Sequence, residues 1–232
     1  MSWQEAAKKA AALEAVKHVE SGQIVGLGSG STVVYAFREI ARRIREEKLS
    51  ILGVPTSKMT FSLASELEIP LTTLDDHPKL DLAIDGADQV DEALNLIKGM
   101  GGALTREKIV DSSSNQLIIV VDETKLARKL GLDQPVPIEI LPFATATVLG
   151  QLSKLGAHPA IRSSERGERM LTDNGNYIFD VDLGPIDDPI ATNMRLKMIP
   201  GVVETGLFLG MADIIYVGLK NGLVRKMKGN RT

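Results

Sequence analysis

Short apolar runs alternate with amphipathic stretches along the chain as far as Gly131. The apolar runs are as short as buried strands usually are, and they comprise Ile24–Leu27, Ser50–Val54, Leu80–Ile84, Leu94–Ile97 and Leu117–Val121. The stretches between them have hydrophobic residues at helical spacing and comprise Trp3–Glu20, Val33–Glu47, Ser57–Glu66, Ala103–Ser112 and Glu123–Leu130, the last with Asp122 as its N-cap. This alternation predicts an α/β fold, with a Rossmann-like, mostly parallel sheet and helices on both faces.

The pattern changes after Gly131 and returns near the end of the chain. The middle region predicts two helices, Ala144–Leu155 and Ile190–Met198, and three strands, Ala160–Arg162, Ile178–Val181 and Val202–Thr205. Strand-like runs resume at Ile214–Val217 and Leu223–Val224, and we expect the basic run Arg225–Lys228 to be a solvated end. The sequence therefore predicts a discontinuous Rossmann-like domain, residues 1–131 and 206–232, with a smaller α+β domain, residues 132–205, inserted into it.

Composition narrows the class of protein. The 232 residues are 44% hydrophobic and 25% charged, which is typical of a folded globular protein and excludes bulk disorder. The chain has no Cys, which excludes a disulfide scaffold, a Cys-ligated metal and thiol catalysis. A net charge of −3 disfavours a nucleic-acid surface. No apolar run is long enough to span a bilayer, and Met1–Lys9 lacks the apolar core of a secretory signal. We expect a cytoplasmic protein with no membrane partner.

The first candidate site follows the first predicted strand, where Gly26–Thr32 reads GLGSGST. Glycines permit a tight turn, and the helix that follows offers free N–H groups and a positive dipole end, which suit a phosphate. A simple strand–helix turn with Ser31 as N-cap explains the same residues equally well. A dinucleotide site is disfavoured because no carboxylate follows the second strand. A P-loop is excluded because no lysine follows the last glycine of the turn.

The second candidate site is Asp85-Gly86-Ala87-Asp88, at the end of the third predicted strand. Two carboxylates this close, in a partly desolvated crevice, are able to divide the roles of acid and base. These four residues alone favour a simple turn in which Asp85 binds its own backbone. The calcium-loop spacing of an EF-hand is not matched.

The third candidate site begins at Lys98-Gly99-Met100-Gly101-Gly102 and continues to Glu107, one turn into the next predicted helix. A cation, backbone N–H donors and a carboxylate are the groups needed to form and stabilise an enediolate. The alternative is that Arg106, Glu107 and Lys108 form an exposed, charged helix face.

Taken in order, these segments resemble the ribose-5-phosphate isomerases of the A type. The matching segments are Gly26–Thr32, Asp85–Asp88 (DGAD), Lys98–Val110 (KGMGGALTREKIV), Asp122–Lys125 (DETK), Thr172–Asn176 (TDNGN) and Ile199–Phe208 (IPGVVETGLF). Two departures are Gln89, where the family usually has Glu, and Met100, where many members have Gly.

The resemblance implies an aldose–ketose isomerase that interconverts D-ribose 5-phosphate and D-ribulose 5-phosphate in the non-oxidative pentose phosphate pathway. It implies that Glu107 transfers the proton through an enediol, that Asp85 and Asp88 bind sugar hydroxyls, and that Lys98 stabilises the enediolate. The implied substrate-binding residues are Ser29, Gly30, Ser31, Thr32, Asp85, Gly86, Ala87, Asp88, Lys98, Gly99, Met100, Gly101 and Lys125, with Lys8 a weaker candidate. It further implies no metal, no organic cofactor, a small sugar phosphate as the only partner, and a homodimer or homotetramer.

Two other functions compete with this hypothesis. An amino-sugar-phosphate deaminase would share the phosphate turn, but its chemistry is usually assigned to a His, and none of the three His residues is near these loops. A sugar-phosphate sensor of a transcription regulator would need a DNA-binding domain, for which the chain has no spare length.

Overall fold

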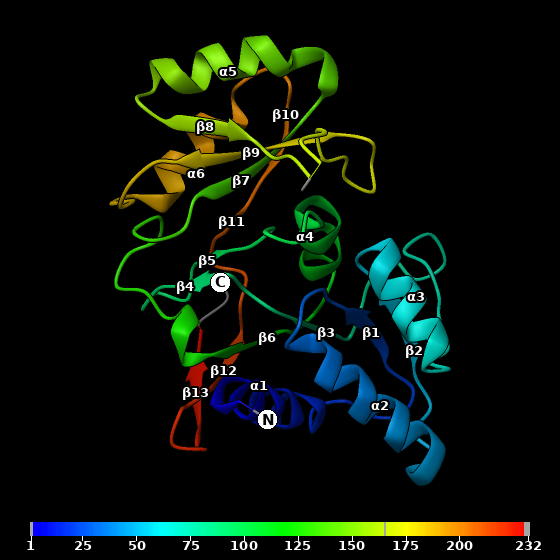
Figure 1. The fold of residues 1–232 in the computed structure, drawn as a ribbon. Helices are drawn as coiled ribbons and strands as arrows, with labels where there is room; N and C mark the ends of the chain where they lie inside the picture. The colour runs from blue at the N-terminus through cyan, green and yellow to red at the C-terminus, as the bar shows by residue number, and fades with distance from the viewer. Residues whose placement is uncertain (1, 165, 230–232) are drawn as a thin grey trace. The chain divides into compact units, whose positions relative to one another are not determined.

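The computed structural model describes residues 2–164 and 166–229 and divides the chain into two compact units. The first unit comprises Met1–Ala87, Arg106–Leu126 and Gly210–Thr232, and the second comprises Asp88–Thr105 and Ala127–Leu209. Within the described ranges, no helix has both the length and the apolar character needed to cross a membrane. Figure 1 shows the elements of both units with their labels.

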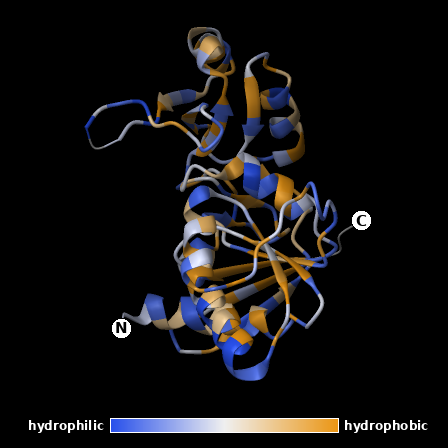
Figure 2. Cartoon of the chain, turned by 90° about the vertical axis from the view of Figure 1, so that its right-hand side faces the viewer, coloured by the Kyte–Doolittle hydropathy of each residue, from blue (hydrophilic) through white to orange (hydrophobic). Residues whose placement is uncertain are grey.

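A six-stranded sheet forms the centre of the first unit. Its strand order is β13-β12-β6-β3-β1-β2, and all neighbouring pairs are parallel except β12 and β13. The strands are β1 (Ile24–Leu27), β2 (Leu52–Pro55), β3 (Leu82–Asp85), β6 (Leu117–Asp122), β12 (Ile214–Gly218) and β13 (Val224–Lys228). Much of this sheet is coloured hydrophobic in Figure 2, as expected for strands that are buried on both faces, and every residue of β3, β6 and β12 is buried.

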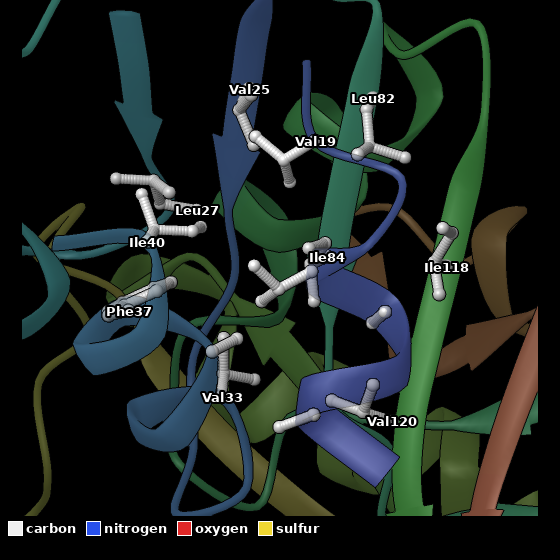
Figure 3. Close-up of a cluster of buried hydrophobic side chains, with 14 of the residues drawn as sticks. Val19, Val25, Leu27, Val33, Phe37, Ile40, Leu82, Ile84, Ile118 and Val120 are labelled. Atoms are coloured by element: carbon white, nitrogen blue, oxygen red, sulfur yellow. The ribbon is translucent and has the colours of Figure 1, made fainter. Parts of the chain in front are cut away.

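Helices cover both faces of this sheet, because alternate residues of each strand point to opposite sides. Helices α1 (Trp3–Val16) and α2 (Val33–Glu47) pack on one face, against an aliphatic core that includes Val25, Leu27 and Ile84 (Figure 3). On the other face, Val110 of α4 (Leu104–Ser112) packs with Val54 and Leu80. Helix α3 (Lys58–Glu66) lies against β2.

The second unit has its own antiparallel sheets and its own core. A four-stranded sheet has the order β10-β7-β9-β8, and a three-stranded one has the order β11-β5-β4. Helix α5 (Thr145–Lys154) packs against β8, and helix α6 (Pro189–Lys197) packs against β10. The strands are β4 (Gln89–Val90), β5 (Leu96–Ile97), β7 (Val136–Ile140), β8 (His158–Ile161), β9 (Tyr177–Asp182), β10 (Val202–Thr205) and β11 (Leu207–Phe208), and a short 3-10 turn, η2 (Pro142–Ala144), precedes α5.

The predicted fold class is confirmed, with differences in individual elements. The segment Arg225–Lys228 is not simply a solvated end, because it belongs to the edge strand β13, although most of its side chains remain exposed. The predicted helix Glu123–Leu130 is wrong in length: only the 3-10 turn η1 (Glu123–Lys125) forms, with Asp122 as its N-cap as expected.

The two compact units and the two expected domains differ in their boundaries. Residues 88–105 belong to the second unit because β4 pairs with β5, and β5 pairs with β11, which follows β10 in that unit. Residues 127–131 and 206–209 also belong to it. The domain boundaries expected from the sequence stay a prediction. They define one domain of residues 1–131 and 206–232 and another of residues 132–205.

Candidate active site

Three neighbouring parallel strands of the first unit carry predicted site residues at their carboxyl ends. The strands are β6, β3 and β1, which are adjacent in the sheet. Segment 28–32 follows β1, Asp85 ends β3, and Lys125 lies in η1 directly after β6. Ligands of open parallel sheets bind beyond the carboxyl ends of the strands, so this edge is where a site is expected.

The glycine turn after β1 packs tightly against Asp85. A Cβ atom at Gly28 would lie 2.3 Å from Cγ of Asp85, so only glycine fits there. Gly30 has a φ of +108°, which also favours glycine. Thr32, and not Ser31, is the N-cap residue of α2, and its side chain makes no capping hydrogen bond. The alternative in which Ser31 serves as the N-cap is therefore wrong.

Asp85 is completely buried and is bound by backbone donors. Its Oδ1 accepts hydrogen bonds from N–H of Ser29 (2.9 Å) and N–H of Gly86 (2.6 Å). The bond to Gly86 is the local turn that the four-residue motif favours, and the bond to Ser29 joins this turn to the glycine turn after β1. The two motifs therefore form one structure at the edge of the sheet.

A cluster of hydroxyl groups lies beside the glycine turn. Oγ of Ser29 is 2.8 Å from Oγ1 of Thr56 and 3.3 Å from Oγ1 of Thr60, and Thr60 donates to the carbonyl oxygen of Gly28. Ser57 caps α3 by accepting from N–H of Thr60. Sequence analysis missed Thr56 and Thr60, because they follow a different strand and reach the turn only through the fold.

A lysine lies beside the exposed hydroxyl of the glycine turn. Nζ of Lys8, in α1, donates to Oγ of Ser31 at 3.1 Å and forms an ion pair with Glu5 at 3.1 Å. Its side chain is 17% exposed. A hydroxyl, a cation and a helix N-terminus together make a site of the kind that binds phosphate.

Glu107 is buried in the first turn of α4, with 4% of its surface exposed. The helix approaches the sheet closely at Gly26, where a Cβ atom would lie 2.8 Å from Cγ1 of Val110. Glu107 is one turn before Val110 along this helix. The alternative of an exposed, charged helix face is therefore wrong for Glu107.

In the second unit, Lys98 is also buried, with 2% of its surface exposed. Its N–H donates to the carbonyl oxygen of Gly206 at 2.9 Å, and its Nζ lies 5.3 Å from the centre of the Phe208 ring. A Cβ atom at Gly206 would lie 2.4 Å from the Lys98 carbonyl oxygen, so the two backbones meet closely. Phe208 supplies a cation–π contact that holds the ammonium group.

The loop after Lys98 is a closed turn that binds Asp88. N–H of Gly102 donates to the carbonyl oxygen of Gly99 at 3.0 Å. N–H of Met100 donates to Oδ2 of Asp88 at 3.0 Å, so Met100 contributes its backbone and leaves its side chain 40% exposed. Both departures from the family are accommodated, because the side-chain oxygen of Gln89 accepts from N–H of Gly131 at 2.8 Å.

The structure thus sorts the predicted site residues into two sets. The first unit contains Ser29, Gly30, Ser31, Thr32, Asp85, Gly86, Ala87, Glu107 and Lys125. The second unit contains Asp88, Lys98, Gly99, Met100 and Gly101. In the part of the chain that the structure describes, no three His, Cys, Asp or Glu side chains are grouped as metal ligands. Metal-free chemistry stays a prediction.

Comparison with known proteins extends the resemblance to almost the whole chain. The family model of ribose 5-phosphate isomerase A (phosphoriboisomerase A) matches residues 52–222. The ribose-5-phosphate isomerase A of Methanothermobacter thermautotrophicus is 50% identical over 217 residues, which are 93% of this chain and 95% of that protein. The chain belongs to the ribose 5-phosphate isomerase A family. It is therefore an isomerase.

Solved structures agree in fold. Ribose 5-phosphate isomerase A of Methanocaldococcus jannaschii is 46% identical, with a TM-score of 0.91 over 96% of this chain and 98% of that one. A D-ribose-5-phosphate isomerase in complex with phospho-erythronic acid is 42% identical, with a TM-score of 0.94 over 98% of this chain and 100% of that one. The Rossmann-like α/β fold and the family expected from the sequence are both confirmed.

Proposed function

We propose that this protein interconverts D-ribose 5-phosphate and D-ribulose 5-phosphate by proton transfer through an enediol, in the non-oxidative pentose phosphate pathway. The observation that carries the proposal is the similarity to the isomerase complexed with phospho-erythronic acid. That acid is a four-carbon sugar-acid phosphate whose planar carboxylate resembles the enediolate of a five-carbon sugar phosphate. A site that accepts it recognises a phosphate at one end and stabilises a negative, planar oxygen group at the other.

Glu107 is the proposed base. It takes the proton from C2 of the open-chain aldose and returns it to C1. The proton lost by the C2 hydroxyl balances the one gained by the C1 oxygen, so the C1 carbonyl becomes a hydroxyl and the C2 hydroxyl becomes a carbonyl. Atoms and electrons balance without a redox cofactor, because the oxidation at C2 equals the reduction at C1. Burial of Glu107 supports this role, since a fixed carboxylate shielded from water is suited to transferring one proton twice.

Lys98 and the N–H groups of Gly99–Gly101 are the proposed stabilisers of the enediolate oxygen. The cation–π contact with Phe208 and the turn closed by Gly102 support this, because both fix donors before charge develops. Asp85 and Asp88, with Gly86 and Ala87 between them, are proposed to bind sugar hydroxyls, and Asp85 to assist ring opening.

The phosphate is proposed to bind the glycine turn after β1. Gly30, Ser31 and Thr32 offer hydroxyl and N–H donors at the start of α2, and Lys125 and Lys8 offer positive charge. Ser29 contributes its backbone and orients the turn through Asp85 and Thr56.

The experiment that tests the function is turnover of ribose 5-phosphate by the purified protein in deuterium oxide. We expect ribulose 5-phosphate to form, with solvent deuterium entering the sugar at the proton-transfer positions. A sensor would bind the sugar phosphate without this exchange. A deaminase would release ammonia from an amino-sugar phosphate, and either result in place of isomerisation would contradict the proposal.

The cytoplasmic location and the homodimer or homotetramer stay predictions of the sequence. Sedimentation equilibrium of the purified protein measures the oligomeric state directly. A homodimer or homotetramer is expected, and a monomer at micromolar concentration would contradict it.

A further inference from the structure

A largely buried arginine side chain binds the turn that follows Lys98. Arg162 comes directly after β8, and its side chain is 10% exposed. Its Nε donates to Oδ2 of Asp180 at 2.8 Å and its Nη2 donates to Oδ1, which makes a bidentate ion pair with a carboxylate of β9. The Arg162 backbone is bound on both sides, to the carbonyl oxygen of Ile178 and to N–H of Met170. The guanidinium group is therefore fixed in place.

The third nitrogen of this guanidinium reaches the turn. Nη1 of Arg162 donates to the carbonyl oxygens of Gly99 and Met100, each at 2.9 Å. Arginine is suited to this arrangement because its planar fork binds a carboxylate with two nitrogens and still presents the third. A lysine ammonium, which is a single point of charge, is unable to reproduce the geometry.

The contact with Arg162 includes the carbonyl of the middle peptide of this turn. The turn runs from Gly99 to Gly102, and its middle peptide joins Met100 to Gly101. Type I and type II turns differ by a flip of the middle peptide, and type II needs a positive φ at the third residue. Gly101 would adopt that φ without steric cost, yet it lies outside the positive-φ region. The observed orientation, in which the Met100 carbonyl accepts from Arg162, is therefore one of two that Gly101 permits.

This orientation determines the direction of two N–H groups. In a planar trans peptide the N–H points opposite to the preceding carbonyl. Because the Gly99 carbonyl faces Arg162, N–H of Met100 points away from it, and it donates to Asp88. By the same geometry N–H of Gly101, an exposed residue, points away from Arg162.

We propose that Arg162, held by Asp180, is a positioning residue that fixes the Gly99–Gly102 turn so that N–H of Met100 stays on Asp88 and N–H of Gly101 faces the developing enediolate. This inference rests on the proposed function, in which backbone N–H groups of this turn stabilise the enediolate. Arg162 itself touches no reacting atom in this account. It acts by preventing the Met100–Gly101 peptide from flipping and presenting a carbonyl oxygen to a negative charge.

The kinetic test compares Arg162→Ala and Arg162→Lys with Arg166→Ala, a control at an exposed position of the same loop. We expect both Arg162 variants to lose roughly 10²-fold in kcat, the usual effect of removing an oxyanion donor, with KM changed by less than about threefold. Added guanidinium ion should restore part of the kcat of Arg162→Ala and none of that of Arg162→Lys, whose side chain occupies the space. A kcat within about threefold of wild type in Arg162→Ala would overturn the inference.

A crystal structure of Arg162→Ala provides a measurement that does not depend on activity. We expect the Met100–Gly101 peptide to flip or to show both orientations, with Gly101 at positive φ. A single, unchanged orientation would overturn the inference even if kcat falls. Absence of isomerisation by the wild-type protein would instead refute the proposed function, and the two failures are therefore distinguishable.

Discussion

At the residue scale, two buried charged groups have different proposed tasks. Glu107 is the proposed base, and Lys98 is proposed to stabilise the negative charge that proton transfer creates on the substrate. A buried lysine is costly unless something stabilises its charge, and the Phe208 ring does so. Many aldose–ketose isomerases use a divalent cation in this position, so the role of Lys98 is open to a direct test.

We predict that Lys98 replaces a metal. Exhaustive treatment with EDTA should leave the wild-type kcat unchanged, and Lys98→Ala should lose roughly 10²–10³-fold in kcat, as for loss of one oxyanion donor. Steady-state kinetics with and without chelator measure both effects, with Lys154→Ala, at an exposed position of α5, as the control. Loss of activity in EDTA that Mg²⁺ or Mn²⁺ restores would assign Asp85 and Asp88 to a metal instead.

Variants of the proposed phosphate site should change KM, whereas Lys98→Ala should change kcat. Lys125→Ala and Thr32→Ala should act on binding, because a charge-assisted hydrogen bond contributes about 1.5–3 kcal/mol, which corresponds to a roughly 10- to 100-fold rise in KM. Inhibition by inorganic phosphate should weaken in parallel. The matched control is Lys79→Ala, at an exposed position of the same unit. An unchanged KM in both variants would place the phosphate elsewhere.

At the element scale, a buried carboxylate of β7 joins two segments of the second unit by hydrogen bonds. Glu139 is fully buried, and it accepts hydrogen bonds from Thr105, in the first turn of α4, at 2.6 Å and from Thr172 at 3.0 Å. It also accepts from the side-chain amides of Asn174 and Asn176, at 3.1 and 2.8 Å. The TDNGN segment that carries part of the family resemblance is therefore built around this carboxylate.

We predict that Glu139→Ala lowers the free energy of unfolding by roughly 3–5 kcal/mol, because it removes the acceptor of several buried hydrogen-bond donors at once. Glu139→Gln keeps one oxygen for the amides and places a donor opposite the Thr105 hydroxyl, so it should lose much less. Urea denaturation of the three proteins measures the difference. Equal stability of Glu139→Ala and the wild type would show that the network contributes nothing.

The elements that sequence analysis predicted are those whose pattern is local. The strand Ile24–Leu27 and the helix Val33–Glu47 formed as expected, because one has a run of apolar residues and the other a periodic face. Strand β7 was not predicted, because proline is rare inside sheets and this segment contains Pro137 and directly follows Pro135. Strands β4 and β11 have two residues each, too few for any pattern.

In the candidate site, too, features with a local sequence pattern were predictable and those that depend on the fold were not. The glycine turn and Asp85 were predictable because each motif creates its own backbone geometry. Arg162 and Glu139 were not, because each acts on a loop more than thirty residues away along the chain, and only the fold brings them there.

At the scale of the whole molecule, stability has a component that depends on pH. His18 follows α1, and its Nε2 lies 2.9 Å from the hydroxyl of Tyr216 on β12. Burial lowers the pKa of His18 below its usual value, and the positive charge of Lys226 lowers it further. The unfolded chain therefore binds this proton more readily than the folded one, and stability from this site is complete above about pH 6.5 and declines as the pH falls.

We predict that the Tm of the wild type falls between pH 7.5 and 5.5 by about 1–2 °C more than that of His18→Gln, which retains a polar partner for Tyr216 and does not titrate. Thermal unfolding at a series of pH values, at constant ionic strength, measures this. The same pH dependence in both proteins would mean that His18 does not contribute to it.

The proposed transfer of the proton by a single carboxylate is tested most sharply by Glu107→Gln. Its steady-state kcat on ribose 5-phosphate is compared with that of the wild type and of Glu66→Gln, which removes the charge of an exposed carboxylate in α3. We predict that Glu107→Gln lowers kcat by about 10²–10⁴-fold with little change in KM, while Glu66→Gln has no effect. Retention of more than about a tenth of the wild-type kcat by Glu107→Gln would contradict the account.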